Sequence, residues 1–305
     1  MKLSIVIPTY NRPQELSRCL TALAKEVGND GQCEVIVVDD CSEASVKALL
    51  LSECSSHGYA YHYQKQNSGA AACRNAGIEI AQGDWVCFID DDVEVQSGWY
   101  SVITRQCESV AQTVLGIEGA VTCDIDNLWD GEVSNSRGGL YLTCNIAYRL
   151  SALKLVNGFD VRFRDSMADD QELACRIIDK GEIVFAADCV VRHQKRNVNL
   201  PLFVWRSPLR IKKLLAAECL FAALHPSRYK TLRRASTFWG TYRTILLRHC
   251  ISSLRRRSSV QLRRHAVATL FLLCGELLAQ CAAWFYLPAM SRLQYQIHTQ
   301  LANRT

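Results

Sequence analysis

Short apolar runs alternate with segments of helical periodicity through the N-terminal part of the chain. Six runs have the length and composition of buried strands, and they cover residues 3–7, 34–38, 59–63, 84–89, 119–123 and 183–187. Helices are predicted between them, because Leu16, Leu20 and Leu23 lie at helical spacing and residues 70–81 form an Ala-rich stretch. This alternation predicts an α/β fold with a mostly parallel sheet and right-handed crossovers.

Polar residues follow the predicted strands at the points where they end. The segment Pro8-Thr9-Tyr10-Asn11-Arg12 follows the first strand, Asp39-Asp40 the second, Asn67-Ser68-Gly69 the third, and Asp90-Asp91-Asp92 the fourth. Because the carboxyl ends of parallel strands meet at one edge of a sheet, we expect these four loops to converge on one crevice.

The three consecutive carboxylates, Asp90, Asp91 and Asp92, suggest a metal site. Adjacent acids repel one another, and crowding at the end of an apolar strand raises their pKa values unless a cation neutralises them. Mn²⁺ and Mg²⁺ favour one or two carboxylates together with the phosphate oxygens of a substrate. The alternative interpretation is a solvated acidic loop without a ligand.

Charge divides the chain into an acidic and a basic part. Residues 1–191 carry 15 Lys and Arg against 28 Asp and Glu, a net charge of −13, whereas residues 192–264 carry 18 against one, a net charge of +17. We therefore expect a catalytic domain over residues 1–195 and a basic helical region over 196–305 that contacts a polyanion or an anionic membrane. The N-terminus lacks the pattern of a secretory signal, and the 15 cysteines include no CxxC pair, so we expect a cytoplasmic protein with reduced thiols.

Six motifs in order resemble those of the inverting nucleotide-sugar glycosyltransferases of family 2, which have the GT-A fold. They are SIVIPTYNR, VIVVDDCS, NSGAAACRNAG, FIDDDVE, NGFDVRF, and ADDQELACR with VVRH downstream, and they lie within residues 2–195. The resemblance implies a Mn²⁺- or Mg²⁺-dependent enzyme that uses a nucleotide-sugar donor, most commonly a UDP-sugar. A dinucleotide dehydrogenase is disfavoured, because no G-x-G-x-x-G follows the first strand.

The resemblance also implies a nucleotide site. Its members would be Pro8, Tyr10, Asn11 and Arg12 along the pocket, Asp39 at the base edge, Asp40 supporting the loop, Asn67, Gly69 and Arg74 beneath the nucleotide, and Asp91 toward the ribose. Two alternatives stay open. Asp39 or Asp40 could serve as a turn residue or helix cap, and Arg74 could form a buried structural ion pair.

Within the acidic triplet, the family's Asp-x-Asp pattern corresponds to Asp90 and Asp92, with Asp92 as the direct metal ligand. His193 follows an apolar strand at a position where members of the family place a further metal or phosphate contact; the alternative is a structural histidine. The metal would assist departure of the nucleotide by neutralising the charge of its diphosphate.

Asp170 corresponds to the general base, which would deprotonate the acceptor hydroxyl. The usual pair at this position is Glu-Asp, whereas this chain has Asp169-Asp170. A helix N-terminus stabilises a carboxylate anion, so we expect Asp170 to be ionised, and we expect one of the two aspartates to cap the helix. Glu172 is the alternative base. Residues 158–160 and 144–145 are expected on the acceptor side.

The basic region contains two predicted helices, 202–225 and 236–251, and an apolar segment, 266–287. The apolar segment is long enough for one membrane crossing, but Glu276 and Gln280 share one helical face, which suits an amphipathic or partner-packed helix. We expect contact with the inner face of a membrane and no nucleic-acid binding. The predicted function is transfer of a sugar to a glycan or lipid-linked acceptor in cell-surface polysaccharide biosynthesis; a silent nucleotide-sugar-binding module and a transferase to polyprenyl phosphate are the alternatives.

Overall fold

The structure is a computed structural model of the 305-residue chain. It describes residues 2–27, 31–123, 134–164, 168–194 and 200–233, together with Cys281, Tyr286 and Arg292. The chain divides into two compact units, residues 1–196 and residues 197–305, which are described separately below.

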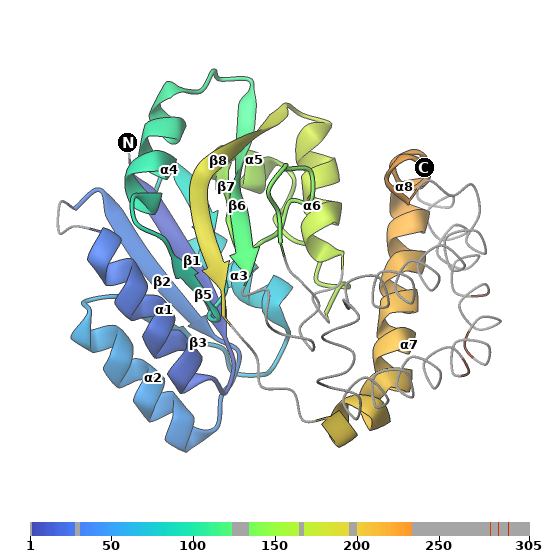
Figure 1. The fold of residues 1–305 in the computed structure, drawn as a ribbon, viewed down its shortest axis with the longest axis horizontal. Helices are drawn as coiled ribbons and strands as arrows, with labels where there is room; N and C mark the ends of the chain where they lie inside the picture. The colour runs from blue at the N-terminus through green and yellow to red at the C-terminus, as the bar shows by residue number, and fades with distance from the viewer. Residues whose placement is uncertain are drawn as a thin grey trace, which may run out of the picture. The chain divides into compact units, whose positions relative to one another are not determined.

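In the described part of the first unit, one eight-stranded sheet has the order β3-β2-β1-β4-β7-β6-β8-β5 (Figure 1). The strands are β1 (Leu3–Thr9), β2 (Cys33–Asp39), β3 (Ala60–Tyr63), β4 (Trp85–Phe88), β5 (Val93–Val95), β6 (Val114–Cys123), β7 (Ile146–Arg149) and β8 (Glu182–His193). The first four in chain order are parallel, β7 is antiparallel to β4 and β6, β8 is parallel to β6, and β5 is antiparallel to β8.

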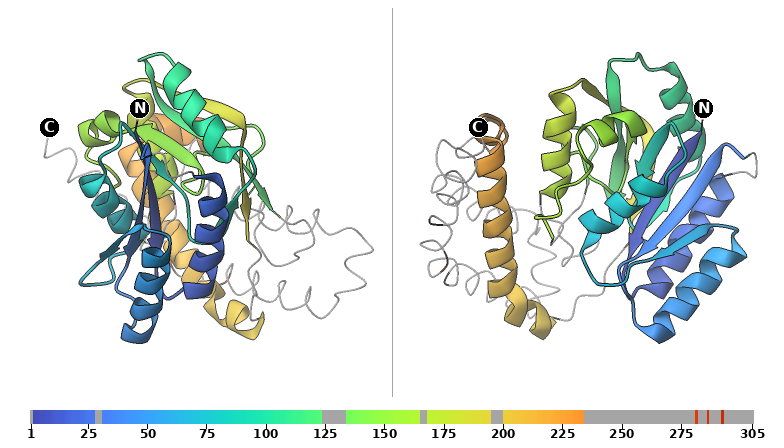
Figure 2. Two further views of the ribbon diagram at one scale, coloured as in Figure 1. Left: turned by 90° about the vertical axis from the view of Figure 1, so that its left-hand side faces the viewer. Right: turned by 180° about the vertical axis from the view of Figure 1, so that it is seen from behind.

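Helices cover both faces of the sheet (Figures 1 and 2). One face carries α1 (Pro13–Glu26), α2 (Ala44–Ser56) and α4 (Trp99–Ser109), and the other carries α3 (Ala70–Ile80), α5 (Leu150–Leu155) and α6 (Asp169–Ile178). The alternation of strand side chains feeds both cores: Ile5 and Ile7 pack with the first set of helices, and Val6 packs with the second. All three side chains are buried, as expected for a sheet covered on both sides.

All six predicted strands are present, but the sheet is mixed at one side because two further strands join it. β5 and β7 have three and four residues and were not predicted. β7 enters the sheet between β4 and β6 in the opposite direction. Segments this short carry too little periodicity to be recognised before their pairing partners are known.

The described part of the second unit contains α7 (Leu200–Leu224), with Pro208 inside it, and α8 (Pro226–Arg233). The predicted helix 202–225 corresponds to α7. The predictions for 236–251 and 266–287 lie outside the described residues, apart from Cys281 and Tyr286. Among the described residues, no helix has both the length and the apolar character that a membrane crossing needs.

Candidate active site

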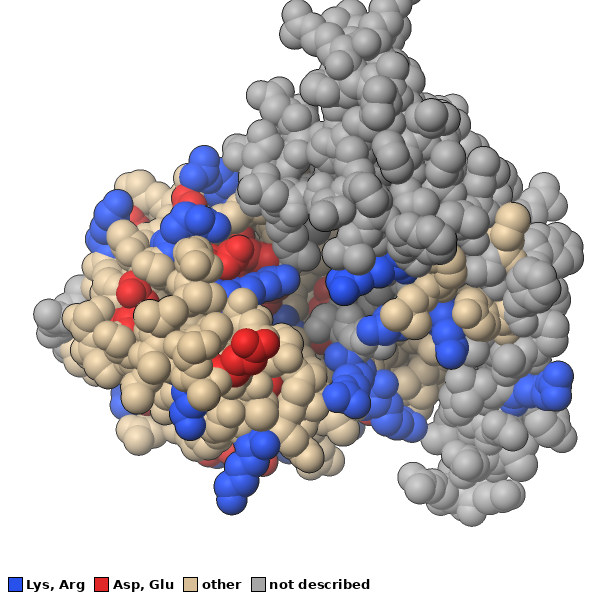
Figure 3. Space-filling view, turned by 90° about the horizontal axis from the view of Figure 1, so that it is seen from below, with Lys and Arg blue, Asp and Glu red and all other residues tan. Residues whose placement is uncertain are grey.

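The parallel pairing of β1 with β2 and β4 brings the ends of these strands together. Thr9 lies in register with Asp39, and the backbone N–H of Ile89 donates to the carbonyl of Val6, so Asp90 follows beside the end of β1. Figure 3 shows the molecule from the side toward which these strands run, with acidic and basic side chains close together on that face. The predicted convergence of the strand ends is therefore confirmed.

Two members of the acidic triplet are almost completely buried. Asp91 and Asp92 are only 4% and 1% exposed, whereas Asp90 is partly exposed. Asp91 accepts hydrogen bonds from Thr9 Oγ1 at 2.8 Å and from Arg12 Nη1 at 3.0 Å. Burial raises the pKa of Asp91 to about 6, although Arg12 opposes the shift. Two of the three carboxylates are thus desolvated, which argues against the alternative of a solvated acidic loop.

His193 lies next to Asp92 because β5 and β8 pair in antiparallel register. Val93 is opposite His193, and the N–H of Gln194 donates to the Asp92 carbonyl at 2.7 Å. This pairing brings His193 Nε2 to 3.5 Å from Asp92 Oδ1. Two of the three predicted metal ligands therefore meet, although they lie far apart in the sequence.

The third predicted ligand, Asp90, turns instead toward Arg74. Arg74 Nη2 donates to Asp90 Oδ1 at 2.7 Å, and its Nη1 donates to Asp169 Oδ2 at 3.1 Å. Arg74 is 2% exposed, so the guanidinium forms a buried bridge from the acidic triplet to the start of α6. Of the two possibilities for Arg74, the ion pair is the one observed; a contact with phosphate stays a prediction.

The donor atoms around Asp92 fit a hard divalent cation. Within the described ranges, no group of three His, Cys, Asp or Glu side chains has the arrangement of a protein-only metal centre. However, Mg²⁺-type sites usually combine one or two carboxylates with substrate phosphates, and the buried carboxylate of Asp92 beside His193 supplies such a partial set. The residues present therefore suit an ion that binds together with a diphosphate.

The predicted base, Asp170, lies in the first turn of α6 and is partly buried. The N–H of Gln171 donates to Asp170 Oδ1 at 2.7 Å. Burial and, to a smaller extent, the neighbouring charge of Asp169 raise the pKa of Asp170 to about 7, although the hydrogen bond from Gln171 opposes the shift. The expectation that the helix terminus keeps this pKa low is wrong, because desolvation outweighs the helix dipole.

Neither aspartate caps α6, contrary to the prediction. The N-cap residue is Ala168, which has φ 64°, and it makes no side-chain capping bond. Asp169 and Asp170 are instead the first two residues of the helix, and the Asp170 carboxylate accepts from the N–H of Gln171 within the first turn. Asp169 uses this position to bind Arg74.

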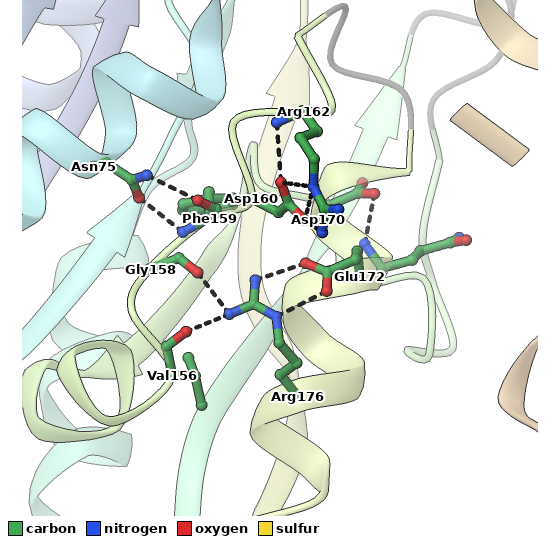
Figure 4. A network of polar contacts seen from close by, with 10 residues as sticks. Asn75, Val156, Gly158, Phe159, Asp160, Arg162, Asp170, Glu172 and Arg176 are labelled. Atoms are coloured by element: carbon green, nitrogen blue, oxygen red, sulfur yellow. Dashed lines mark hydrogen bonds and ion pairs between the residues drawn. The ribbon is translucent and has the colours of Figure 1, made fainter. Parts of the chain in front are cut away.

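Glu172, the alternative base, is committed to Arg176 one turn later. Arg176 donates to both oxygens of Glu172, at 2.8 and 2.6 Å, and to the carbonyls of Val156 and Gly158 (Figure 4). Because this pair ties α6 to the preceding turn, Glu172 has a structural role, and the assignment of the general base to Asp170 stays a prediction.

The turn before α3 is held by Asp40. Its two carboxylate oxygens accept from the N–H groups of Ser68 and Gly69 at 2.7 and 2.8 Å, and Asn67 Nδ2 donates to the Asp40 carbonyl. Asp40 therefore supports the predicted nucleotide loop and also caps α3 from a distance, since Gly69 is the N-cap residue of α3. The same hydrogen bonds therefore account for Asp40 both as a support of the loop and as a helix cap.

Asp39 is fully buried, and protein groups occupy its carboxylate. Ser42 donates to Oδ1 through its N–H and its hydroxyl, at 2.9 and 2.6 Å, and Tyr61 donates to Oδ2 at 2.5 Å. A contact with the base edge stays a prediction.

The remaining pocket residues differ in exposure. Pro8 is buried in β1, whereas Tyr10 is exposed and free to cover a bound base. Asn11 has φ 53°; its N–H donates to Ser42 Oγ, and its side-chain oxygen accepts from the N–H of Glu43 at the start of α2. Asn11 therefore fixes the turn in which Tyr10 and Arg12 project.

A comparison with family models matches residues 4–148 to the model described as "Glycosyl transferase family 2". Residues 4–148 belong to glycosyl transferase family 2. This segment contains the acidic triplet and Arg74, whereas Asp170 and His193 lie C-terminal to it.

Sequence relatives agree with this family. An uncharacterized glycosyltransferase of Haemophilus influenzae is 34% identical over 112 residues, which are 37% of this chain and 34% of the relative. A Campylobacter jejuni protein described as GalNAc(5)-diNAcBac-PP-undecaprenol beta-1,3-glucosyltransferase is 29% identical over 117 residues, which are 38% of this chain and 37% of the relative. The chain thus spans about a third of the length of these relatives.

Solved structures show the same fold over most of the chain. Staphylococcus aureus TarS 1–349 in complex with UDP-GlcNAc has a TM-score of 0.58 at 15% identity and covers 100% of this chain and 93% of its own. The mannosyltransferase PcManGT of Pyrobaculum calidifontis, in complex with GDP-Man and Mn²⁺, has a TM-score of 0.56 at 15% identity over 92% of this chain and 87% of its own. The expected GT-A fold is confirmed.

Two buried polar residues of the family 2 domain were not anticipated in their observed roles. Asn145, expected on the acceptor side, uses its amide within the core, with bonds to Trp99 Nε1 and to the carbonyls of Ala120 and Cys189. Glu118 accepts from Asn135 Nδ2 and from the N–H groups of Gly139, Leu140 and Tyr141, and so holds the loop after the undescribed segment 124–133. For Glu118, the sequence gives one indication of a buried polar role, namely a single Glu within an apolar strand.

Proposed function

We propose that the protein is a metal-dependent inverting glycosyltransferase that moves a sugar from a nucleotide diphosphate-sugar to a hydroxyl of a glycan or lipid-linked acceptor. The observation that carries the proposal is the buried bridge from Asp90 through Arg74 to Asp169. This bridge links a carboxylate cluster suited to a metal diphosphate with a helix start that presents the base Asp170. The bridge therefore fixes the proposed donor site and the proposed base relative to each other.

The donor half consists of the turn at Tyr10 to Arg12, the Asp40-supported loop and the acidic triplet. Asp92, His193 and Asp90 would hold the ion, and Asp91 lies beside them toward the nucleotide side. A bound Mn²⁺ or Mg²⁺ would supply positive charge that stabilises the departing diphosphate. UDP is the proposed nucleotide, supported by the solved TarS complex with UDP-GlcNAc.

The acceptor half uses Asp170 as the general base. In the proposed step, the acceptor oxygen attacks the anomeric carbon while its proton passes to the Asp170 carboxylate. The bond between the anomeric carbon and the diphosphate oxygen breaks, and the nucleotide diphosphate takes the electron pair. Attack from the face opposite the leaving group inverts the anomeric centre. A pKa of about 7 suits this role, because such a carboxyl is a stronger base than an ordinary aspartate yet is ionised in part near neutrality.

The acceptor class is proposed from the relatives and from charge. The Campylobacter jejuni relative is described as acting on an undecaprenol-linked glycan, which supports a cell-surface polysaccharide or its lipid-linked precursor. The strongly basic stretch 192–264 would attract an anionic membrane, so we place the enzyme in the cytoplasm at the inner membrane face. Transfer to polyprenyl phosphate and a silent nucleotide-sugar-binding module are the alternative functions.

A thermal-shift panel tests the donor site. UDP, GDP, dTDP and CDP would each be added with and without Mn²⁺ to the wild-type protein, to Asp92→Asn and to the exposed control Asp188→Asn. We expect one nucleotide to raise the Tm of wild type and the control only when Mn²⁺ is present, with the shift lost in Asp92→Asn. No shift with any nucleotide would overturn the proposal. A shift without hydrolysis or transfer of any sugar would favour the silent module.

A further inference from the structure

We propose that Arg12, which bridges Asp91 and Asp92, competes with the divalent cation for Asp92, so that the cation binds tightly only when a nucleotide diphosphate draws the guanidinium away. This inference rests on the proposed function. It adds an order of events to that function, since Arg12 makes metal binding conditional on the nucleotide.

The geometry places one nitrogen of Arg12 between two carboxylates. Arg12 Nη1 lies 3.0 Å from Asp91 Oδ1 and 3.1 Å from Asp92 Oδ2. Both carboxylates are buried, whereas the Arg12 side chain is 40% exposed. The guanidinium therefore closes the solvent side of the pair and acts as its counterion.

A guanidinium and a divalent cation cannot share this position at low energetic cost. Coulomb repulsion between charges a few ångströms apart is strong where water is largely excluded. Nη1 already donates a hydrogen bond to Asp92 Oδ2, and Asp92 is the predicted direct metal ligand. A cation that binds alone must therefore displace Arg12 into solvent, which weakens its apparent affinity.

A diphosphate removes this obstacle because it offers Arg12 an equivalent partner. Arg12 is the N-cap residue of α1, in the turn directly after β1, and Pro13 begins the helix behind it. Among the described residues, its bonds to the two aspartates run through Nη1 alone, so Nε and Nη2 can still approach an anion. Guanidinium–phosphate pairs are charge-assisted and frequently bidentate, which makes this exchange of partners favourable.

The exchange predicts reciprocal coupling between the two ligands. A diphosphate that binds Arg12 leaves Asp91 and Asp92 without their counterion and so raises the affinity of the site at Asp92 for the cation. By linkage, the cation raises the affinity for the diphosphate by the same factor.

The test is Mn²⁺ binding measured by electron paramagnetic resonance, without any turnover. Wild type, Arg12→Gln, Arg12→Lys and Lys25→Gln would be titrated with Mn²⁺ alone and with Mn²⁺ in the presence of UDP. Lys25 is an exposed residue in the last turn of the same helix, so Lys25→Gln removes one positive charge away from the carboxylates. Thermal unfolding of each variant with and without Mn²⁺ is the second readout.

We expect Arg12→Gln to bind Mn²⁺ alone at least tenfold more tightly than wild type, and UDP to tighten Mn²⁺ binding in wild type far more than in this variant. Mn²⁺ alone should raise the Tm of Arg12→Gln, whose buried carboxylates lack a counterion. Arg12→Lys, which keeps the charge, and Lys25→Gln should resemble wild type. Equal Mn²⁺ affinity of wild type and Arg12→Gln without UDP would overturn the inference, while a Mn²⁺-dependent UDP shift in wild type would still support the proposed function. If Arg12→Gln does not fold, tight binding of Mn²⁺ to wild type without UDP overturns the inference on its own.

Discussion

Arg74 donates a hydrogen bond of 2.7 Å to Asp90 and thereby ties the end of the central strand β4 to the first turn of α6, where the same guanidinium reaches Asp169. The guanidinium also lies over the ring of Phe159, with its central carbon 5.6 Å from the ring centroid. One buried guanidinium thus connects the proposed donor half of the site to the proposed acceptor half. A substitution of Arg74 should therefore lower both the free energy of unfolding and the catalytic rate.

Arg74→Met should lower the free energy of unfolding by about 3–5 kcal/mol, because it leaves two carboxylates beside an apolar side chain without their buried partner. Urea denaturation measures the loss. Arg105→Met, an exposed position on α4, is the control and should change the free energy by less than about 0.5 kcal/mol. A variant of Arg74 as stable as the control would show that the bridge contributes nothing to folding.

Asp170→Asn should reduce kcat by roughly 10²–10⁴ while nucleotide binding stays intact, because the amide cannot accept the proton of the acceptor. Initial rates at saturating donor, together with the Mn²⁺-dependent shift in Tm given by UDP, separate the two properties. Glu172→Gln should act mainly through stability, since Glu172 is paired with Arg176. Wild-type turnover by Asp170→Asn would remove Asp170 from the mechanism.

The activity of the wild-type enzyme should rise with pH through about 7, because Asp170 must be ionised to act as a base and burial raises its pKa to about 7. Stability should move in the opposite direction. The folded pKa lies above the value of an unfolded aspartate, about 3.9, so the folded state retains a proton that the unfolded state has lost. The stability from this group is complete below that lower value and is lost as the pH rises through 7.

A pH–rate profile and urea denaturation at several pH values check both directions. In Asp170→Asn the acid limb of the residual activity near pH 7 should disappear, and the fall in stability between pH 4 and 7 should become smaller. An acid limb near pH 4 in the wild-type enzyme would contradict the predicted pKa.

Gly69→Ala should destabilise the protein and weaken nucleotide binding. Gly69 has φ +90°, and an added Cβ would lie 2.5 Å from the carbonyl oxygen of Arg164, a backbone atom that cannot move aside on its own. Gly58→Ala is a matched control, because Gly58 has φ +70° with open space around the position. The control should cost about 1–2 kcal/mol from backbone strain alone, and Gly69→Ala should cost more. Equal losses would mean that the turn and residue 164 separate readily.

Glu118→Gln should lower the free energy of unfolding by about 1–3 kcal/mol, since the new amide NH₂ group would face N–H donors that now share a carboxylate. Limited proteolysis should show faster cleavage within residues 134–141, the segment that Glu118 holds. Glu182→Gln, at the exposed start of β8, is the control. Unchanged protection of the segment would show that the remaining contacts of the loop suffice.

The sequence predicts the donor side of the fold well, because long apolar runs locate β1, β2 and β4 and because their last residues are the polar ones. Thr9, Asp39 and Asp90 thereby come together without further information. Prediction from the sequence fails for short strands that are defined by the strands with which they pair. The three residues of β5 are recognisable as a strand only once β8 lies beside them, and the reversed direction of β7 has no local signal.

The sequence also could not predict the pKa of Asp170 or the charged partner of Arg74. The position of Asp170 at a helix start favours an ionised carboxylate, but its burial and its neighbour Asp169 depend on the tertiary fold and reverse the direction of the shift. Arg74 is similar. A single arginine in an Ala-rich helix could reach phosphate or aspartate, and only the packing of α3 beneath β4 and α6 decides which partner lies nearest.

The antiparallel pairing of β5 with β8 has a consequence for biosynthesis. A nascent chain that has left the ribosome only as far as β7 already contains all three carboxylates of the triplet, but His193 has not yet been added. β8 pairs with both β6 and β5, and its last residue, His193, lies opposite Val93, the residue after Asp92. Contacts between such distant segments form late in folding. The emerging polypeptide therefore contains all of the proposed cation ligands only when translation has passed β8, and a fragment released earlier lacks His193.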